Sequence, residues 1–397
     1  MDKVQLRKKM TLLAAVGQAQ ALDGREAGLQ AAHQALNQLG SAACTLGVVI
    51  FPHRYEAQQV VNGVASLLGP MPLIGFSTSA SLTADGMHPH SVVVALLCAS
   101  EARAQVQWLA GFDPGSPEAA QQLAGLFSQA PGQTALLFAD GFNTDGEQLC
   151  ASLPPAARLI GALSSGDLHL GNACQIGGKQ SGSSGVALAR LEGGIKTGVG
   201  YGHGWQPVGS HFRVTRSRGF WLRALDGRPA SEAYAHLFGY PAGEWGVPPL
   251  DNLVRIYPLG LEGAGEGLLV RSPLRVEADG SFRMNTTIQS GSDAHLLMGS
   301  PSACLAAAQA AARQAVAALE GAKPALALVL VDLAWQMLFE SQPGAEIAAV
   351  REVLGAEVPI AGGYTLGQIV PSSEGTPQFL NQHMAVVIFG EMGEKDK

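Results

Sequence analysis

The sequence predicts an α/β protein in which a β-α-β-β unit occurs three times, forming mixed sheets in two packed domains. Each copy combines an apolar strand, a helical stretch, a strand that ends in glycine and small polar residues, and a further apolar strand. The chain of 397 residues is 47% hydrophobic and 14% charged and contains 50 glycines, which is typical of a buried α/β protein with tight corners. A chain of this length exceeds one compact core, so we expect two domains.

The repeated strands recur in the same order in each copy, and internal similarity of this kind decides the architecture. The strands are expected at residues 47–51, 72–79 and 91–97, at 135–139, 159–165 and 185–189, and at 326–331, 359–365 and 384–389. Apolar periodicity predicts helices at residues 25–39, 56–68, 117–128, 226–237, 301–319 and 345–354. The helix at 301–319 has the clearest start, because Ser300 is a good N-cap and Pro301 suits the first turn.

Composition excludes several classes of protein. The net charge of −7 argues against a non-specific nucleic-acid binder. No run of about 18 apolar residues is present, so we expect no membrane span. Residues 7–16 loosely imitate a secretion signal, but Gln18 and Gln20 interrupt the cleavage region, and residues 10–16 are better explained as a first strand.

The five cysteines are widely spaced, odd in number and without a Cys-x-x-Cys pair. This pattern predicts neither a disulfide framework nor a zinc site and is typical of a reducing cytoplasm. We therefore expect a cytoplasmic location.

Small polar residues follow equivalent strands in all three copies, and open α/β sheets bind ligands where strands end. We expect these hydroxyl and amide groups to converge on one pocket and to orient a polar small molecule. The alternative is that each small residue only forms a tight corner. The predicted pocket residues are Ser77, Thr78, Ser164, Ser165, Tyr364 and Gln368.

Two charged residues extend this predicted site. Arg271 follows an apolar strand and is the candidate counter-charge for a ligand carboxylate. Asp332 lies at the end of an apolar run, where a carboxylate must be hydrogen-bonded, cap a helix or line a cleft.

Two further patterns have competing interpretations. Glycines alternate from Gly198 to Gly204, which places them on one face of a strand and favours close protein packing over ligand binding. Haem is a possible cofactor, because one axial histidine and an apolar pocket suffice. The candidate histidines are His88, His90, His203, His211 and His383.

The sequence resembles FIST-domain proteins over nearly its whole length, and the resemblance implies a FIST N-terminal domain at residues 8–218 and a FIST C-terminal domain at residues 219–393. The matching segments are residues 73–80, 204–209, 214–216, 225–230, 269–274, 359–369 and 380–382. The resemblance implies an intracellular sensory module for small ligands such as amino acids. It also implies partners among histidine kinases, cyclic-dinucleotide enzymes and chemotaxis receptors, and some members resemble haem-binding nitric-oxide sensors.

The chain departs from the family pattern at two places. The family usually has Cys-x-x-Arg where this chain has Asp332 to Trp335, and Gly-Glu where this chain has Gly367 and Gln368. Ligand chemistry that depends on those family residues is therefore not expected here.

We expect a non-catalytic protein that binds a small ligand and passes a change to a partner in signal transduction. A haem-based nitric-oxide sensor is the alternative. An enzyme is a distant third, because local spacing assembles no nucleophile with its base and no paired carboxylates.

Overall fold

The computed structural model describes residues 12–40, 42–127, 134–154, 158–248, 250–262 and 268–391. The first residues of the strand predicted at 10–16 and the end of the helix predicted at 117–128 lie outside these ranges. The α-helices are α1 (Gly24–Leu39), α2 (Ala57–Leu68), α3 (Pro117–Phe127), α4 (Gly146–Ala151), α5 (Ala230–Phe238), α6 (Leu253–Ile256), α7 (Pro301–Ala317), α8 (Leu333–Leu338) and α9 (Ala345–Leu354), with 3-10 turns η1 (Ala242–Glu244) and η2 (Leu250–Asn252).

Two sheets form the body of the protein. In the first sheet the strand order is β1 (Leu12–Ala19), β6 (Val92–Ala99), β2 (Leu46–Pro52), β3 (Leu73–Thr78), β10 (Gln175–Gly177) and β11 (Gln180–Gly182). In the second the main order is β13 (Ile195–Gly202), β25 (Met384–Glu391), β22 (Lys323–Asp332), β23 (Ile360–Pro371), β9 (Arg158–Ser164), β8 (Thr134–Asp140), β12 (Gly185–Glu192) and β7 (Arg103–Ala110). Three short strands join the second sheet beside β23: β4 (Ser81–Thr83), β5 (Gly86–His88) and β24 (Pro377–Leu380).

The three predicted copies share one topology, which confirms the repeated unit. In unit one, β2 runs parallel to β3 and antiparallel to β6, and β1 joins the outer side of β6. Unit two repeats this pattern with β8, β9, β12 and β7. Unit three repeats it with β22, β23, β25 and β13. Units two and three share the second sheet because β9 pairs with β23.

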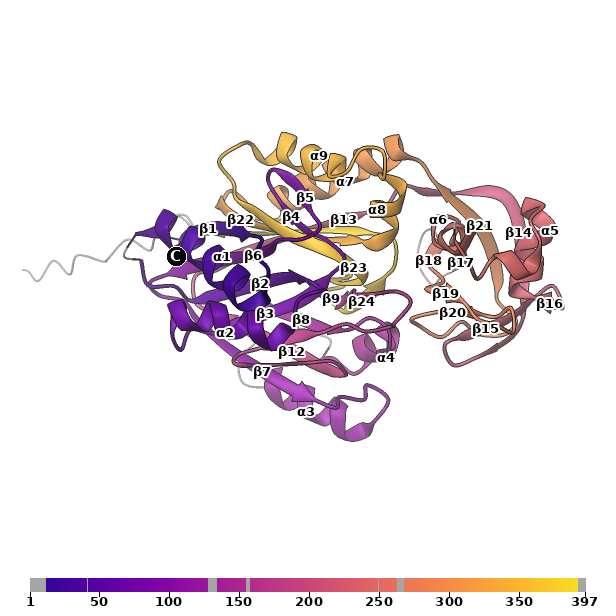
Figure 1. The fold of residues 1–397 in the computed structure, drawn as a ribbon, viewed down its shortest axis with the longest axis horizontal. Coiled ribbons are helices and arrows are strands. Elements are labelled where there is room, and N and C mark those ends of the chain that lie inside the picture. The colour runs from indigo at the N-terminus through magenta and orange to yellow at the C-terminus, as the bar shows by residue number, and fades with distance from the viewer. Residues whose placement is uncertain are drawn as a thin grey trace, which may run out of the picture.

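The body has four layers, helix on sheet on sheet on helix, as Figure 1 shows. Side chains alternate across each strand, so Val48 and Ile50 of β2 pack between the sheets while Val49 and Phe51 pack under α1 and α2. The outer face of the second sheet is covered by α3, α4, α7, α8 and α9. The α/β class and the mixed sheets predicted from the sequence are confirmed.

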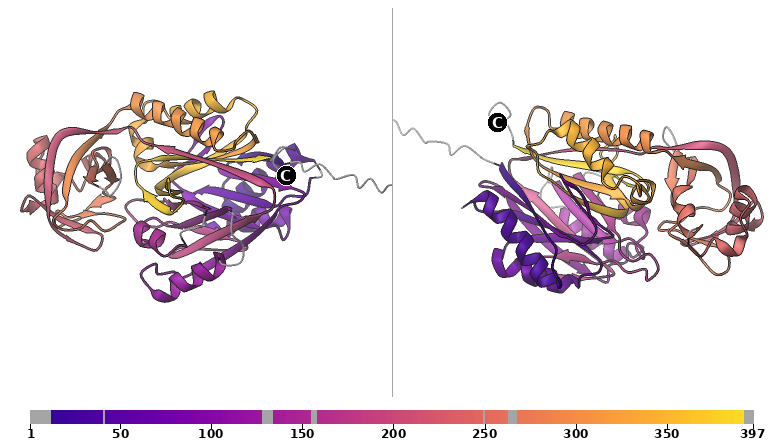
Figure 2. Two further views of the ribbon diagram at one scale, coloured as in Figure 1. Left: turned by 180° about the vertical axis from the view of Figure 1, so that it is seen from behind. Right: turned by 45° about the horizontal axis from the view of Figure 1, so that its top comes forward.

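A smaller lobe, residues 205–299, lies at one end of the body (Figure 2). Its sheet has the order β18 (Leu268–Arg271), β17 (Leu259–Glu262), β21 (Asp293–Gly299), β14 (Trp205–Arg218), β15 (Trp221–Leu225), β20 (Phe282–Arg283) and β19 (Arg275–Val276), with β16 (Arg228–Pro229) on β15. The lobe is inserted between β13 and α7 of unit three, where the other units have a short connection. The predicted domain boundary at residues 218 and 219 falls inside it and stays a prediction.

The glycines of β13 let α7 approach the sheet closely. A Cβ on Gly198 or Gly200 would lie 2.0 Å from a backbone oxygen of α7, and one on Gly204 would lie 2.4 Å from the nitrogen of Cys304. The alternating glycines therefore serve close packing, as the sequence predicts. The N-terminus of α7 is also as predicted, because the Ser300 side chain accepts from the nitrogen of Ala303.

The helix predicted at 226–237 begins four residues later than expected. Asp226 and Gly227 both have positive φ, of 50° and 78°, and they connect β15 to β16 in a tight hairpin. An Asp-Gly pair favours this type of turn, so the hairpin displaces the helix start to Ala230.

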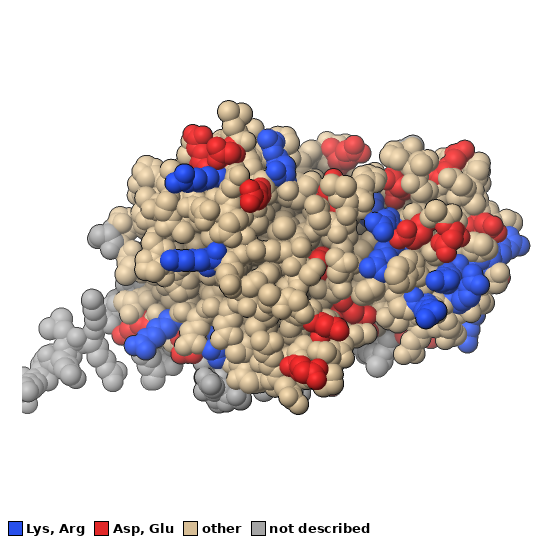
Figure 3. Space-filling model, turned by 60° about the horizontal axis from the view of Figure 1, so that its bottom comes forward, with Lys and Arg blue, Asp and Glu red and all other residues tan. Residues whose placement is uncertain are grey.

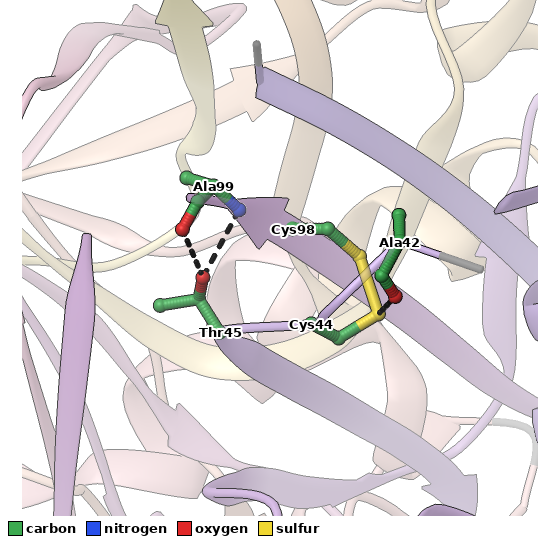
Figure 4. Close-up of a disulfide and its surroundings, with 5 residues drawn as sticks. All are labelled: Ala42, Cys44, Thr45, Cys98 and Ala99. Atoms are coloured by element: carbon green, nitrogen blue, oxygen red, sulfur yellow. Dashed lines mark hydrogen bonds between the residues drawn. A yellow bond between two sulfur atoms is a disulfide. The ribbon is translucent and has the colours of Figure 1, made fainter. Parts of the chain in front are cut away.

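Cys44 and Cys98 form a disulfide, which corrects the expectation of no disulfide (Figure 4). The pairing of β2 with β6 brings the two residues together, and the Thr45 hydroxyl beside them accepts from the nitrogen of Ala99 at 3.0 Å. Because disulfides persist in oxidising compartments, the cysteine pattern no longer supports the predicted cytoplasmic location, which stays a prediction.

Among the described residues, no helix is long and apolar enough to cross a membrane. On the face shown in Figure 3, charged side chains are sparse over the body and gather over the lobe. Both signs of charge are present on the lobe in that view.

Replacing Gly200 with alanine tests the contact between β13 and α7. The new Cβ would meet the Ala311 oxygen at 2.0 Å, and neither backbone can shift freely, so we expect the free energy of unfolding to fall by about 1–3 kcal/mol. Gly125→Ala in α3 is the control, because nothing lies within 4 Å of its Cβ position. Urea unfolding of both variants checks the expectation, and equal stability of Gly200→Ala and the wild type would contradict it.

Thiol titration of the unfolded, unreduced chain tests the disulfide. We expect only Cys150, Cys174 and Cys304 to react, and all five cysteines to react after reduction. The bond closes a loop across 54 residues, so reduction should lower the free energy of unfolding by about 4 kcal/mol in the chain-entropy description. Reaction of all five thiols without a reductant would refute the pairing.

Candidate functional site

Equivalent strands from the three units are hydrogen-bonded to one another in a buried cluster that we call the corner knot, which lies at the ends of β3 and β9 and within β23. It consists of Ser77, Thr78, Ser165 and Tyr364. The Ser77 hydroxyl donates to the Ser165 oxygen at 2.6 Å, and the Ser165 hydroxyl donates to the Tyr364 oxygen at 2.6 Å. Thr78 Oγ1 lies 2.9 Å from the same Tyr364 oxygen. Four of the six predicted pocket residues therefore meet directly.

The corner knot is closed to solvent, since none of its residues is more than 1% exposed. Its hydroxyl groups satisfy backbone groups that would otherwise be buried without partners. Ser164, beside the knot, pairs in register with Thr365, and its hydroxyl has no partner among the described residues. Tyr364 directs its own hydroxyl away from the knot, to Glu346 of α9.

An open cleft of about 460 Å³ lies immediately beyond the corner knot, and we call it the junction cleft. All three units and the lobe contribute to its walls. Ser79 and Gly166 directly follow knot residues, and α8 follows the first strand of unit three. The lining residues are His53, Ser79, Gly166, Asp167, Leu168, His169, Asn252, Ile256, Leu333, Gln336, Met337 and Glu340.

A tight loop after β9 forms one wall of the junction cleft. Asp167 Oδ1 accepts from the nitrogens of His169 and Leu170 at 2.8 and 3.0 Å, and Asp167 bridges to Asn172. These backbone bonds, with nearby His53, lower the pKa of Asp167. Gly166 is required here, because a Cβ would lie 1.8 Å from the Asn172 oxygen.

The charged groups of the junction cleft favour a cation. Asp167 and Glu340 are its carboxylates, and its lining contains histidines but no lysine or arginine. Opposite charge in a partly enclosed cleft attracts an ammonium group. Leu168, Ile256 and Leu333 add apolar surface beside these charges, as is typical of small-molecule sites.

Asp332 caps α8, the helix that forms another wall. Its carboxylate accepts from the nitrogens of Ala334 and Gln382 at 3.1 and 2.8 Å, so it is hydrogen-bonded and capping as predicted. Burial raises its pKa to about 6. The nearby cation is Arg255, whose pKa burial lowers to about 10.

Gln382 connects this cap to the lobe. Its φ is 62°, an uncommon conformation for a residue other than glycine. Its side-chain amide donates to the Arg255 oxygen at 2.6 Å and to the Ser272 hydroxyl at 2.8 Å, both in the lobe. Trp335 donates to its backbone oxygen at 2.9 Å. The turn at Gln382 is therefore a buried joint between body and lobe.

Gln368 holds the same turn from the other side. Its amide donates to the Thr365 hydroxyl at 2.8 Å, and its oxygen accepts from the nitrogen of His383 at 3.2 Å. The two departures from the family pattern, at Asp332 and at Gln368, thus bind successive backbone nitrogens of one turn. Neither residue lines the junction cleft.

Arg271 lies away from the junction cleft. Its buried guanidinium pairs with the half-exposed carboxylate of Glu147 of α4 and donates to the Val270 oxygen at 2.9 Å. Both residues line a different cleft of about 330 Å³ between α4 and the lobe. The structure therefore does not bring Arg271 to the predicted hydroxyl cluster, and its role as a ligand counter-charge stays a prediction.

Two of the histidines singled out from the sequence, His88 and His383, are held by neighbouring polar groups. His88 lies 2.9 Å from both Gln18 Nε2 and Thr83 Oγ1. His383 is buried with Nδ1 2.7 Å from the Asn381 oxygen, and burial together with neighbouring His203 lowers its pKa to about 3. Among the described residues, no group of three or more His, Cys, Asp or Glu side chains could hold a metal ion.

Sequence reasoning missed His53 and His169, which line the junction cleft. Each is near the end of a repeated strand, so position relative to β2 and β9 was the available signal. Asn252 and Ile256 were also missed, because they belong to the lobe and reach the cleft only through tertiary packing. Met337 of α8, whose thioether also lines the cleft, was missed as well.

Two sequence profiles match most of the chain. One, described as the FIST N domain, matches residues 45–228, and the other, described as the FIST C domain, matches residues 230–371. Comparison with curated proteins found no match.

Solved structures give only weak similarities. One is titled "T. maritima PurL complexed with FGAR", with 11% identity, 96% of this chain and 73% of that chain covered, and a TM-score of 0.25. Another is phosphoribosylformylglycinamidine synthase II from Thermotoga maritima, with 11% identity, 97% and 72% covered, and a TM-score of 0.24. Scores this low carry no argument about fold or activity.

The raised pKa of Asp332 predicts a pH dependence of stability. Its pKa moves from 3.8 when unfolded to about 6 in the folded chain, so folding favours the protonated acid, and this contribution is lost as pH rises through 6. We expect the stability of Asp332→Asn relative to wild type to improve by about 3 kcal/mol between about pH 4 and pH 7. Urea unfolding across this range measures the difference, and a flat difference would contradict the assignment.

Proposed function

This chain belongs to the family of FIST-domain proteins, and from this premise we propose that it is a sensory protein that binds a small ligand in the junction cleft. FIST domains are associated with sensing in signal transduction and are in general non-catalytic. The supporting observation is that one cleft of about 460 Å³ receives residues from all three units and from the lobe. A ligand there would contact all three units and the lobe.

The ligand carries an ammonium group, as an amino acid or a small amine does. Asp167 is held as a carboxylate by two backbone nitrogens, and Glu340 is the second carboxylate of the cleft. Gln336 and Asn252 supply amide groups on the walls formed by α8 and the lobe. A small number of polar groups beside apolar surface gives a pocket orientation and selectivity.

The corner knot then acts as the rigid base of the site and not as its surface. Ser77, Thr78 and Ser165 place the residues that follow them at the cleft edge. Rigid elements hold a binding constellation better than free loops do. The predicted contacts of the knot residues with the ligand thus become indirect in this proposal.

The signal passes through the lobe. Asn252 and Ile256 of the cleft lie next to Arg255, whose backbone oxygen accepts the Gln382 amide. A ligand that prefers one placement of α6 against α8 shifts the population of lobe positions. A partner such as a histidine kinase, a cyclic-dinucleotide enzyme or a chemotaxis receptor would respond to that shift.

A haem-based sensor is the second candidate function, and the junction cleft favours it over the other histidine positions. His53, His169 and Met337 line one cleft, and imidazole and thioether groups are common axial ligands of haem iron. Either histidine would hold the iron, and the haem would supply affinity for a diatomic gas.

Thermal unfolding with a library of amino acids, amines and small acids tests the proposal. A ligand at a hundredfold excess over its Kd should stabilise the native chain by about 3 kcal/mol. We expect Asp167→Asn, which keeps a side-chain oxygen for the loop, to weaken binding of an ammonium ligand at least about tenfold. Asp226→Asn, in the exposed lobe hairpin, is the matched control.

Binding that is unaffected by Asp167→Asn would place the ligand elsewhere. Reconstitution with haem separates the two candidates: a Soret band that disappears in His53→Ala or His169→Ala, together with no stabilisation by any amine, would replace the amine proposal with the haem proposal.

A further inference from the structure

Another cleft, of about 210 Å³, lies between the lobe and unit two. We call it the arginine cleft, because two arginines of the lobe, Arg275 and Arg283, form one wall. Phe142 and Asn143, which follow β8, form the opposite wall. Leu168 lines both this cleft and the junction cleft, so the two are neighbours across the loop after β9.

The two arginines are direct cross-strand partners. Arg275 of β19 pairs in register with Arg283 of β20, and like charges directly opposite each other destabilise a sheet. The lining of the arginine cleft contains no carboxylate. Arg275 has an acidic partner, Glu277, at 3.1 Å from its Nε. Glu277 and Asp140 also act electrostatically on Arg283 from outside this lining, but their effect is smaller than that of burial and of Arg275.

Neighbouring aromatic rings and a backbone oxygen hold the guanidinium of Arg283 in place. Its guanidinium lies 4.3 Å from the ring centroid of Phe220 and 4.6 Å from that of Trp221. Its Nη2 donates to the Phe142 oxygen at 3.0 Å. Its Nη1 is buried and has no hydrogen-bond partner among the described residues, although a buried guanidinium donor without a partner is costly.

Arg275 reaches across the same cleft towards the loop after β9. A Cβ built on Gly171 would lie 3.7 Å from Arg275 Nη1 and 3.9 Å from Phe142. Burial and the neighbouring Arg275 both lower the pKa of Arg283. An anion between the two guanidinium groups relieves their repulsion and gives the free Nη1 donor an acceptor.

We propose that the arginine cleft binds an oxyanion, the carboxylate or phosphate group of a small molecule, between Arg275 and Arg283. Arginine forks match the geometry of both anions and form charge-assisted hydrogen bonds with them. The volume of about 210 Å³ suits the anionic group of a small molecule. Occupancy neutralises the charge on the lobe wall and so stabilises its contact with unit two. This site goes beyond the amine site of the junction cleft and does not require it.

Titration of the full chain with inorganic phosphate and, separately, with succinate tests the site at constant ionic strength. Calorimetry gives the affinity, and tryptophan fluorescence gives a second signal because Trp221 lies against Arg283. We expect saturable binding of at least one probe. The preferred probe identifies the source of the anion as a phosphorylated compound or a carboxylic acid.

Two variants locate the binding. Arg275→Ala removes one part-exposed guanidinium, and Arg283→Lys keeps the charge but removes the fork, so we expect each to weaken the preferred probe at least about tenfold. Arg216→Ala, exposed on β14 of the same lobe, should bind as the wild type does. If Arg283→Lys does not fold, Arg275→Ala decides alone.

The proposal is overturned if neither probe saturates, or if Arg275→Ala binds the probe with wild-type affinity. The binding of phosphate or succinate is independent of the amine proposal, because neither probe carries an ammonium group. Conversely, if an amine ligand binds while phosphate and succinate do not, the proposed amine site in the junction cleft is supported and the proposed oxyanion site in the arginine cleft is contradicted.

Discussion

The hydrogen bonds of the corner knot are the constraint on which the rest of the structure depends. The ends of β3 and β9 and the middle of β23 approach each other so closely that the backbone oxygens of Ser165 and Tyr364 lose access to water, and each then needs a donor. The hydroxyls of Ser77 and Ser165 supply them. These bonds tie the three units to one another, and the residues that directly follow Thr78 and Ser165 line the junction cleft.

A second constraint joins the lobe to this arrangement. Gln382 holds the α8 cap through its backbone and the lobe through its side chain, so three elements share one buried turn. Its side-chain oxygen and the Nε of Arg255 have no hydrogen-bond partners among the described residues. Buried polar groups without partners make the joint less stable than the core around it.

The sequence was sufficient for the repeated unit, because strand periodicity and glycine-rich corners are local signals. It also identified Ser77, Thr78, Ser165 and Tyr364 as neighbours, since equivalent strand ends meet in equivalent places. Contacts that depend on how strands pair, or on a domain inserted into a unit, could not be predicted from the sequence. The Cys44–Cys98 disulfide depends on how β2 pairs with β6, and the lobe residues of the clefts depend on a domain inserted into unit three. No local pattern marks either.

The insertion of the lobe has a consequence for how the chain is assembled. The strands that enter and leave it are paired at their base, Trp205 opposite Gly299, so the lobe is attached through two adjacent points. The body sheet therefore needs no segment of the lobe to complete its own strand order. The strand order of the body is therefore independent of the lobe, while the lobe stays joined to the body at Gln382 and contributes residues to both clefts.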